Sequence, residues 1–267
     1  MQAFLQTPFH QPAEFLRLTG VLFVIIYLRY LFLCGGVHYF LRTWLPTRWR
    51  GRVLNPQPRF AQRLRLDVWR SALTAAVFAP LGTLLIIAWQ GGHTQLYTDW
   101  AAQPWWMVPL GVAAVLLLHE TYYYWLHRWM HHPRVYRYVH RWHHESIETT
   151  ALTSFSFHPF ESFLQAAIIP VFVFLIPLHV YVLVALLLFM TLSAVINHAG
   201  FEVYPRHPAL RWVGRYVIGA THHDLHHKQF TKNYGLYFTF WDRWMRTESE
   251  EFDARFAAAA SSESPGS

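Results

Sequence analysis

Charged side chains are scarce in this sequence. Only 14% of its 267 residues are Asp, Glu, Lys or Arg, whereas 54% are hydrophobic and 18% are aromatic. Because a soluble globular protein usually has about 25% charged residues, this composition favours a membrane protein. The formal net charge of +7 comes from a local cluster of arginines, so it does not indicate nucleic acid as a partner.

Several marks of redox proteins are missing as well. Cys34 is the only cysteine, which excludes an internal disulfide, a cysteine-ligated metal cluster and an iron–sulfur cluster. The sequence contains no GxGxxG dinucleotide fingerprint, no recognisable haem region and no sustained repeat. The chain therefore has no recognisable means of its own to take electrons from a nicotinamide cofactor.

Long apolar runs, by contrast, are present. Residues 16–33, 71–89 and 105–125 are each long enough to cross a hydrocarbon core of about 30 Å. Residues 163–197 are too long for one span and contain two prolines, so we interpret them as a helical hairpin or two short spans. The sequence predicts an all-α, multi-pass membrane bundle with about four spans, the last a hairpin, and a cytoplasmic helical cap.

The two ends of the chain carry further signals. The first apolar run is either a span or a signal peptide, but Glu14 precedes it and neither an early basic cluster nor a small-residue cleavage site is present. We therefore favour a span. Residues 248–267 end in "AAAASSESPGS" and are expected to be disordered.

The distribution of arginines predicts the orientation. Segment 35–71 contains eight arginines, and segment 91–104 contains no Lys or Arg. By the positive-inside rule the first segment is cytoplasmic, in a bacterial inner membrane or the endoplasmic reticulum, and the second is not. Within the first segment, Phe60, Leu64 and Val68 have helical spacing, which fits an interfacial helix or a basic linker.

Histidines recur at helical spacings after the third and fourth apolar runs. The patterns are "HRWMH", "HRWHH" and "HDLHH", in which histidines three or four residues apart share a helix face. Neutral imidazole is a common ligand of Zn, Cu, Fe and Ni, and one metal takes only part of so large a set, so the patterns predict two metals on the cytoplasmic face. The candidate ligands are His127, His131, His140, His143, His144, His223, His226 and His227, with His198 as a ninth.

Other readings of these residues are weaker. A loose metal-buffering tract is low in complexity, whereas these histidines lie among Trp, Tyr and Leu. "HETYY" at 119–123 departs from the zinc-protease pattern HExxH at Tyr123. Glu120 is expected to accept a hydrogen bond from a ligand ring or to have a purely structural partner. Histidines outside the clusters are expected in solvent or in ordinary hydrogen bonds: His10, His38, His93, His179 and His207.

Taken in order, these motifs resemble the fatty acid hydroxylase/sterol desaturase superfamily of integral-membrane di-iron enzymes. The resemblance covers about 110–247 and includes "YYWLHR", "HPFE", "NYG" and "WDRW". Within the superfamily the chain is most similar to C-4 methylsterol oxidases and sterol C-5 desaturases. The resemblance implies membrane helices and a basic cytoplasmic loop in 1–109, a catalytic domain in 110–247 and the nine histidines as metal ligands.

The resemblance also implies residues beside the ligands and some departures. His158 and His222 would lie next to the ligands. Many relatives have Asp in place of Glu120 and Gly in place of Arg246, and some have a further histidine in place of Glu202. Whether Glu202 binds metal or supports His198 is left open.

The activity implied is O2-dependent hydroxylation or desaturation of an unactivated C–H bond in a membrane lipid, such as a sterol or fatty-acyl lipid. Two iron ions would be the cofactor, with zinc possible in purified protein. A zinc-dependent membrane lipid hydrolase and a non-catalytic metal-binding membrane protein are the alternatives. Electrons would come from a separate ferredoxin or cytochrome b5-like carrier and its reductase. That carrier would dock on cytoplasmic arginines: Arg128, Arg134, Arg137, Arg141, Arg211 and Arg215.

Overall fold

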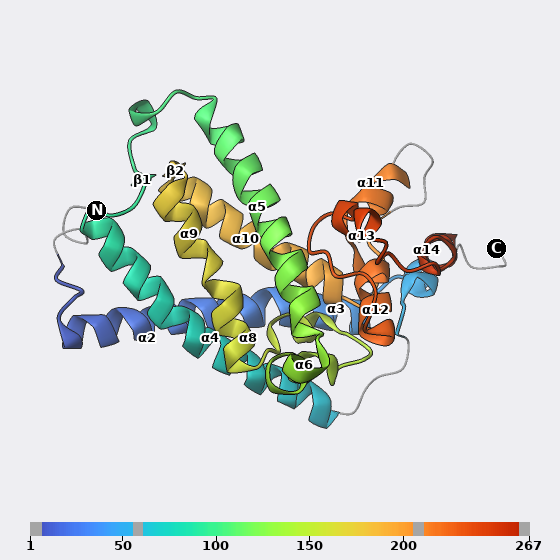
Figure 1. Cartoon of the computed structure of the whole chain (residues 1–267). Helices are drawn as coiled ribbons and strands as arrows, with labels where there is room; N and C mark the ends of the chain where they lie inside the picture. Colours follow the sequence, from blue (N-terminus) through green and yellow to red (C-terminus); the bar gives the residue numbers. More distant parts are fainter. Residues whose placement is uncertain (1–6, 56–60, 205–210, 262–267) are drawn as a thin grey trace.

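The computed structural model describes residues 7–55, 61–204 and 211–261, and these are mostly helical (Figure 1). The amino-terminal half contains α2 (Pro12–Tyr30), η1 (Leu31–Gly35), α3 (Gly36–Thr43), η2 (Thr47–Arg52), α4 (Ala61–Gln90), β1 (Leu96–Tyr97), η3 (Trp100–Ala102) and α5 (Met107–Met130). The rest contains α6 (Pro133–Val139), α7 (Arg141–His144), η4 (Ala151–Phe155), α8 (Pro159–Ala166), α9 (Ile168–Leu175), β2 (Leu178–His179), α10 (Val180–His198), α11 (Arg211–Tyr216), α12 (Ala220–Gln229), α13 (Phe240–Trp244) and α14 (Phe252–Ser261).

In the described part of the chain, three helices are long and apolar enough to cross a membrane. They are Pro12–Thr43, Gln62–Gln90 and Val180–His198. The expected third span is the 24-residue helix α5, but it is not among these three, because its carboxyl half replaces aliphatic residues with His119, Glu120 and tyrosines. The prediction of an all-α membrane bundle is confirmed.

Helices α2 and α4 form an antiparallel pair. The hydroxyl groups of Thr19 and Thr83 lie 2.9 Å apart. The side-chain amide of Gln90, at the end of α4, donates to the carbonyl of Thr7, which precedes α2. A π-helical turn at η1 joins α2 to α3, so the first helix extends well beyond the predicted 16–33. Helix α4 is also longer than its predicted span.

Of the two interpretations of the segment near residue 60, the helix agrees with the structure and the plain linker does not, but the helix is the start of α4 and not a separate element. Phe60 lies outside the described residues, but Leu64 and Val68 belong to α4, which continues without a break into the membrane-spanning run. Both side chains pack against the buried cluster that includes Tyr30 and Phe155. They therefore anchor α4 to the segment that follows α7.

The predicted hairpin is formed by α9 and α10, with β2 at its turn. Strand β2 pairs in parallel with β1, with Leu96 opposite Leu178 and Tyr97 opposite His179. A Cβ atom on Gly111 of α5 would lie 3.0 Å from the Leu178 side chain, so a residue without a side chain allows the hairpin to approach α5 closely.

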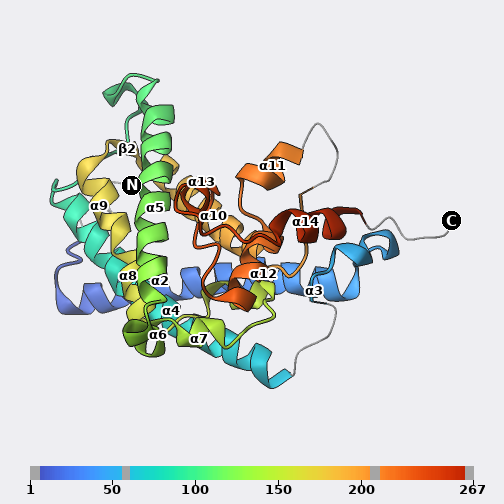
Figure 2. The same ribbon diagram turned by 45° about the vertical axis from the view of Figure 1, so that its right-hand side comes forward.

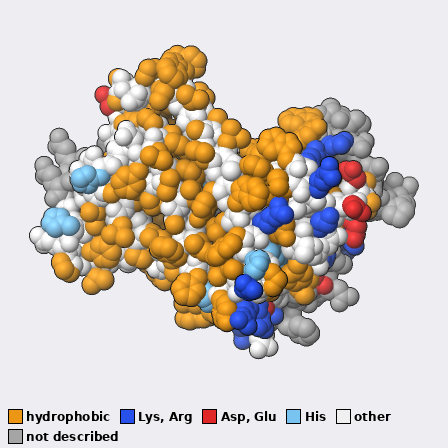
Figure 3. All heavy atoms as spheres, viewed as in Figure 1, with side chains coloured by type: hydrophobic (Ala, Val, Ile, Leu, Met, Phe, Trp, Pro, Cys, Tyr) orange, Lys and Arg blue, Asp and Glu red, His pale blue; other side chains and the backbone are white. Residues whose placement is uncertain are grey.

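The carboxyl-terminal segments α11 to α14 lie on one side of α5, with α13 next to it and α11 and α14 further away (Figure 2). The expected disorder of 248–267 is wrong for α14, because Phe252 and Phe256 are buried against Leu225 of α12; residues 262–267 lie outside the described part. Hydrophobic side chains cover the face formed by the long helices, and charged side chains gather at the end where α11 and α14 lie (Figure 3).

Candidate metal centre

All nine predicted ligands converge at the carboxyl end of α5, in two groups. Within each group the candidate ligand atoms lie within 4.8 Å of one another. One group, here the five-histidine group, consists of His127, His131, His140, His144 and His226. The other, the four-histidine group, consists of His143, His198, His223 and His227.

Short helices place the histidines of the five-histidine group. Helix α5 ends at Met130 with His131 as its carboxyl cap. Pro133 then begins α6, because the fixed φ angle of proline suits the first position of a helix. Because α6 is only seven residues long, the chain turns back at once and brings His140 over His131, with ring centroids 4.8 Å apart.

Each HxxHH motif is divided between the two groups. In "HRWHH" the first and last histidines join the five-histidine group and His143 joins the other. In "HDLHH" the first and last histidines join the four-histidine group and His226 joins the five-histidine group. Histidines four residues apart therefore serve one group, while the middle histidine of each motif, His143 or His226, belongs to the other group.

The ring tautomers of two ligands are fixed by acceptors behind them. His127 Nδ1 donates to the Tyr234 carbonyl at 2.9 Å, and His140 Nδ1 donates to the Glu161 carboxyl group at 2.8 Å. The opposite nitrogens therefore carry lone pairs, yet these two Nε2 atoms lie 3.0 Å apart. Two lone pairs facing each other are unfavourable unless a cation lies between them.

A third ligand of this group repeats the arrangement. His226 Nδ1 donates to the Lys232 carbonyl at 2.7 Å, so its Nε2 also carries a lone pair. That Nε2 lies 3.1 Å from His131 Nε2 and 3.0 Å from His144 Nε2. The donor set of the five-histidine group thus fits a metal ion.

The four-histidine group follows the same logic. His198 Nδ1 donates to the Ala194 carbonyl at 2.8 Å, and its Nε2 lies 2.9 Å from His223 Nε2 and 3.1 Å from His143 Nε2. His227 Nε2 completes the set, 3.1 Å from His143 Nε2. Four nitrogen donors of this kind also fit a metal ion.

The protonation state suits ligation. Burial and the neighbouring imidazoles lower the pKa of His143, His144, His226 and His227 well below the usual 6.5. Imidazole binds a metal through a neutral nitrogen. These rings are therefore ready to bind metal at neutral pH without first losing a proton.

Glu120 does not accept a ring hydrogen bond from a ligand. Its carboxyl oxygens accept the backbone N–H groups of Leu236, Tyr237 and Phe238, at 2.6–3.2 Å. It therefore fixes the segment that places the Tyr234 carbonyl behind His127. The contacts of Glu120 are therefore purely structural, as one of the two predictions had it, and the predicted hydrogen bond from a ligand ring is wrong.

Glu202 has its oxygens committed elsewhere. They accept the N–H and hydroxyl of Thr221 at 3.0 and 2.6 Å and the N–H of Tyr204 at 2.9 Å. Burial raises the pKa of Glu202. Glu202 lies outside both groups and holds the first turn of α12, the helix that carries His223.

The two histidines expected beside the ligands lie in different surroundings. His158 caps α8, accepting the N–H of Phe160, and its ring contacts Trp142. His222 is buried with its Nε2 3.8 Å from an Asp242 oxygen. Both are sequence neighbours of site residues, and neither belongs to a ligand group.

Three positioning residues were missed by the sequence reading. Glu161, the last residue of "HPFE", holds the His140 ring. Asp67 accepts hydrogen bonds from Ser146, Thr153 and Ser156. Arg70 was counted as a cytoplasmic loop arginine, but it is buried. It binds the Trp142 carbonyl and Glu145 at 2.8 and 2.7 Å, next to the ligands of α7.

The histidines outside the clusters also differ among themselves. His10 and His93 are exposed and His38 is half-buried. His179 is buried, with Nε2 3.0 Å from the Thr98 carbonyl and Nδ1 accepting the Tyr181 N–H. His207 lies outside the described residues. Arg246, where relatives were expected to have glycine, has φ 57, a conformation that glycine adopts most easily.

Comparison with known proteins agrees with this geometry. Residues 112–247 match the family model described as fatty acid hydroxylase. The human lathosterol oxidase is 30% identical over 239 residues, which is 88% of this chain and 74% of that protein. No solved structure matches the chain significantly.

Two fungal relatives are similar over a shorter stretch. The Delta(7)-sterol 5(6)-desaturase ERG3B of Gibberella zeae is 28% identical over 72% of this chain, and the erg3B enzyme of Aspergillus fumigatus is 31% identical over 73%. The alignments span 58% of each of these relatives. With half of its length matched by the family model and its histidines gathered into two buried groups, the chain belongs to the fatty acid hydroxylase family, with sterol desaturases among its relatives.

Proposed function

We propose that this protein oxidises an unactivated C–H bond of a membrane lipid, by hydroxylation or desaturation, with O2 as co-substrate and two metal ions, iron when active. The observation that carries the proposal is the convergence of nine buried or half-buried imidazoles into two groups whose lone pairs face one another. The sterol desaturases and lathosterol oxidase among the relatives support a sterol-like lipid as substrate.

In this proposal the five-histidine group holds one ion and the four-histidine group holds the other. Iron held in this way would supply the activation of O2. The protein residues orient the donors and exclude water. The Tyr234 carbonyl and Glu161 fix two rings, and the rings of Phe157 and Phe230 lie against His143 and His144. A dry, rigid donor set limits side reactions during oxidation.

The lipid substrate would enter from the bilayer. Helices α5, α9 and α10 carry exposed leucines, phenylalanines and valines on their outer faces, and the ligand His127 lies near the end of α5. A lipid between these helices could therefore present one carbon to the metal centre while its remainder stays in the hydrocarbon layer.

A separate electron carrier completes the reaction. Reducing O2 to water while oxidising one C–H bond requires two electrons from outside the substrate. Arginines at the histidine end of the molecule are exposed on α5, α6, α7 and α11, and they offer a positive surface to an acidic carrier. Those with described side chains are Arg128, Arg134, Arg137, Arg141 and Arg215.

The orientation is proposed to be cytoplasmic for the histidine end. Single-cysteine labelling in a Cys34→Ala background tests it, with Thr98→Cys in the loop before α5 and Arg134→Cys on α6, both at exposed positions. An impermeant maleimide added outside cells should label the Thr98→Cys protein and leave the Arg134→Cys protein unlabelled. The reverse pattern would overturn the orientation.

The chemistry is tested with iron-loaded protein in lipid nanodiscs, a reducing system and candidate sterols. We expect a product whose formation requires O2, iron and the electron carrier together. Product formed from a lipid ester with zinc and without O2 would indicate the hydrolase alternative. Tight metal binding without any lipid product, across sterol and fatty-acyl substrates, would indicate a non-catalytic metal-binding protein.

A further inference from the structure

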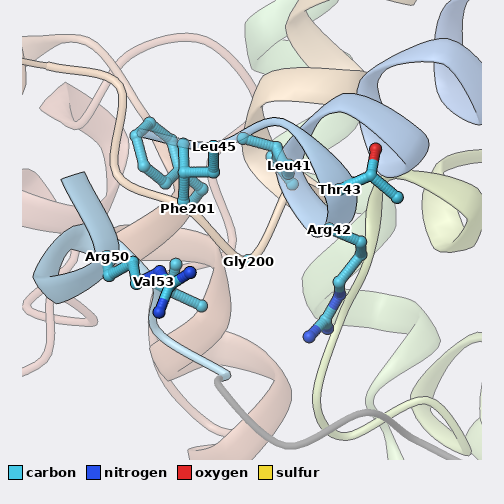
Figure 4. A pocket seen from close by; sticks show the side chains of 9 residues that line it. Leu41, Arg42, Thr43, Leu45, Arg50, Val53, Gly200 and Phe201 are labelled. Atoms are coloured by element: carbon cyan, nitrogen blue, oxygen red, sulfur yellow. The ribbon is translucent and has the colours of Figure 1, made fainter. Parts of the chain in front are cut away.

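A cavity of about 250 Å³ lies outside the metal centre (Figure 4). It lies between the end of α3, the η2 turn and the segment that follows His198. Its nine lining residues contain two arginines and no carboxylate: Leu41, Arg42, Thr43, Leu45, Arg50, Val53, Ala199, Gly200 and Phe201. A site with uncompensated positive charge selects anions.

Most N–H donors of the two arginine side chains have no acceptor within the described chain. Arg42 reaches the Asn55 carbonyl only at 3.4 Å, and within the described chain no hydrogen bond or ion pair of the Arg50 side chain is found. In the view of Figure 4 the two guanidinium groups lie on one side of the cavity, and Leu41 and Phe201 lie on the other. The cavity is therefore amphipathic.

Backbone contacts make the cavity walls rigid. The Leu54 N–H donates to the Gly200 carbonyl at 2.9 Å. Gly200 has φ +63, and a Cβ atom there would lie 2.8 Å from the Thr149 carbonyl. A side chain at position 200 would displace the Thr149 backbone, so this wall of the cavity depends on glycine.

The position of the cavity indicates the edge of a membrane. It follows directly after the apolar helix Pro12–Thr43. Trp44 is 70% exposed, and Tyr39 and Phe40 are also exposed on the last turns of α3. Tryptophan and tyrosine concentrate where hydrocarbon meets headgroups, and arginines in such a position attract anionic lipids.

We propose that this cavity binds the phosphate of an amphiphile, with the headgroup against Arg42 and Arg50 and the chains along the exposed aromatic face of α3. Ligand pockets for whole small molecules are usually about 300–1,000 Å³, so this one holds a headgroup and leaves the chains in the bilayer. The guanidinium fork matches phosphate oxygens in pairs. The proposal does not depend on the oxidation chemistry proposed above.

The test is native mass spectrometry of the purified full chain with phosphatidylglycerol and phosphatidylcholine. We expect the wild type to retain phosphatidylglycerol preferentially. The Arg42→Gln/Arg50→Gln variant should lose about 30-fold of that preference, which corresponds to about 1 kcal/mol for each arginine beside an anionic headgroup. The matched control is Arg134→Gln/Arg137→Gln, which removes the same charge on α6. An equal loss in the control, or no loss in the first variant, would overturn the site.

Two further arms complete the experiment. Arg50→Gln alone removes no described contact, so a loss of preference in this variant cannot be ascribed to misfolding. Excess inorganic phosphate at constant ionic strength identifies the source of the phosphate. If it leaves bound phosphatidylglycerol in place, a lipid headgroup is the ligand. If it displaces the lipid, the same arginines serve a soluble phosphate compound.

Discussion

The two histidine groups differ in how they are enclosed. In the five-histidine group His131 is only half-buried, and the rings of Tyr136 and Tyr234 lie beside it. All members of the four-histidine group are buried. The five-histidine group also has a carboxyl group behind one ring, Glu161 at His140. In the described chain no carboxyl group hydrogen-bonds a ring of the four-histidine group.

This difference suggests unequal roles for two similar donor sets. A carboxyl group behind an imidazole makes that ring a stronger donor, and partial exposure gives O2, substrate or an electron donor a route to the metal. We infer that the metal of the five-histidine group is the one that O2 and the substrate reach, and that the metal of the four-histidine group is enclosed. Each HxxHH motif joins the two, because it supplies rings to both.

The largest effect is expected from removing a ligand. His226→Ala removes the ring whose Nε2 lies 3.1 Å from His131 Nε2 and 3.0 Å from His144 Nε2, so the five-histidine group should bind its ion much more weakly and lose it on dialysis. His227→Ala leaves three rings in the four-histidine group and should have the same result there. Metal analysis should find about one ion per chain in each variant instead of about two. Lipid oxidation should fall by more than about 100-fold in both, because the chemistry needs both ions.

The matched control is His132→Ala. His132 is exposed, adjoins His131 and belongs to neither group, so metal content should stay at the wild-type level. If the His132→Ala protein lost an ion, or if the His226→Ala protein kept both, the assignment of rings to groups would be wrong.

The second effect distinguishes the groups. Glu161→Leu removes the acceptor behind His140, and such partners are usually worth about 10–100-fold in metal affinity or activity. Titration of apoprotein with metal should show one weakened site and one unchanged site, while Glu161→Gln, which keeps an acceptor oxygen, should lose less. Equal weakening of both sites would contradict the comparison.

The sequence predicted the ligands better than their partners, for a physical reason. Helical spacing depends only on local structure, so "HRWHH" and "HDLHH" identify rings that lie near one another independently of the tertiary packing. Which carboxyl group lies behind a ring depends on the packing of α8 against α6 and α7. Glu120 was favoured because it lies near His127 in sequence, whereas Glu161, 21 residues from His140, makes the contact.

The same limit applies to the other differences. A run of hydrophobic residues indicates a span but not its ends, so the length of α2–α3 and the continuity of α4 were missed. Asp67 and Arg70 lie in a basic stretch that predicts only topology, yet both are buried against the segment around α7. The tail was expected to be disordered from its composition, although Phe252 and Phe256 share a helix face.

A third, smaller effect should reach both groups alike. Asp67→Ala leaves the hydroxyls of Ser146, Thr153 and Ser156 without their acceptor, at a cost of about 2–3 kcal/mol in unfolding free energy. Since α7 supplies one ring to each group, both metal sites should weaken to the same extent. The thermal midpoint and a metal titration measure this; a normal midpoint would show that Asp67 is dispensable.

The smallest effect is expected on turnover alone, without a change in either histidine group. Arg137 is exposed on α6, and Arg137→Glu should slow turnover a few-fold at limiting carrier, with metal content unchanged. Because exposed charges are screened over about 8–10 Å at physiological salt, the difference from wild type should shrink as salt rises. Turnover by the purified chain with NADH alone would refute the need for a carrier.

The most direct test of two separate metal sites is an anomalous-scattering map of crystals of the iron-loaded protein. The account predicts two iron peaks. One should be surrounded by Nε2 atoms of His127, His131, His140, His144 and His226, and the other by those of His143, His198, His223 and His227. A single peak shared by both groups, or a peak bound by Glu202 or Glu120, would contradict it.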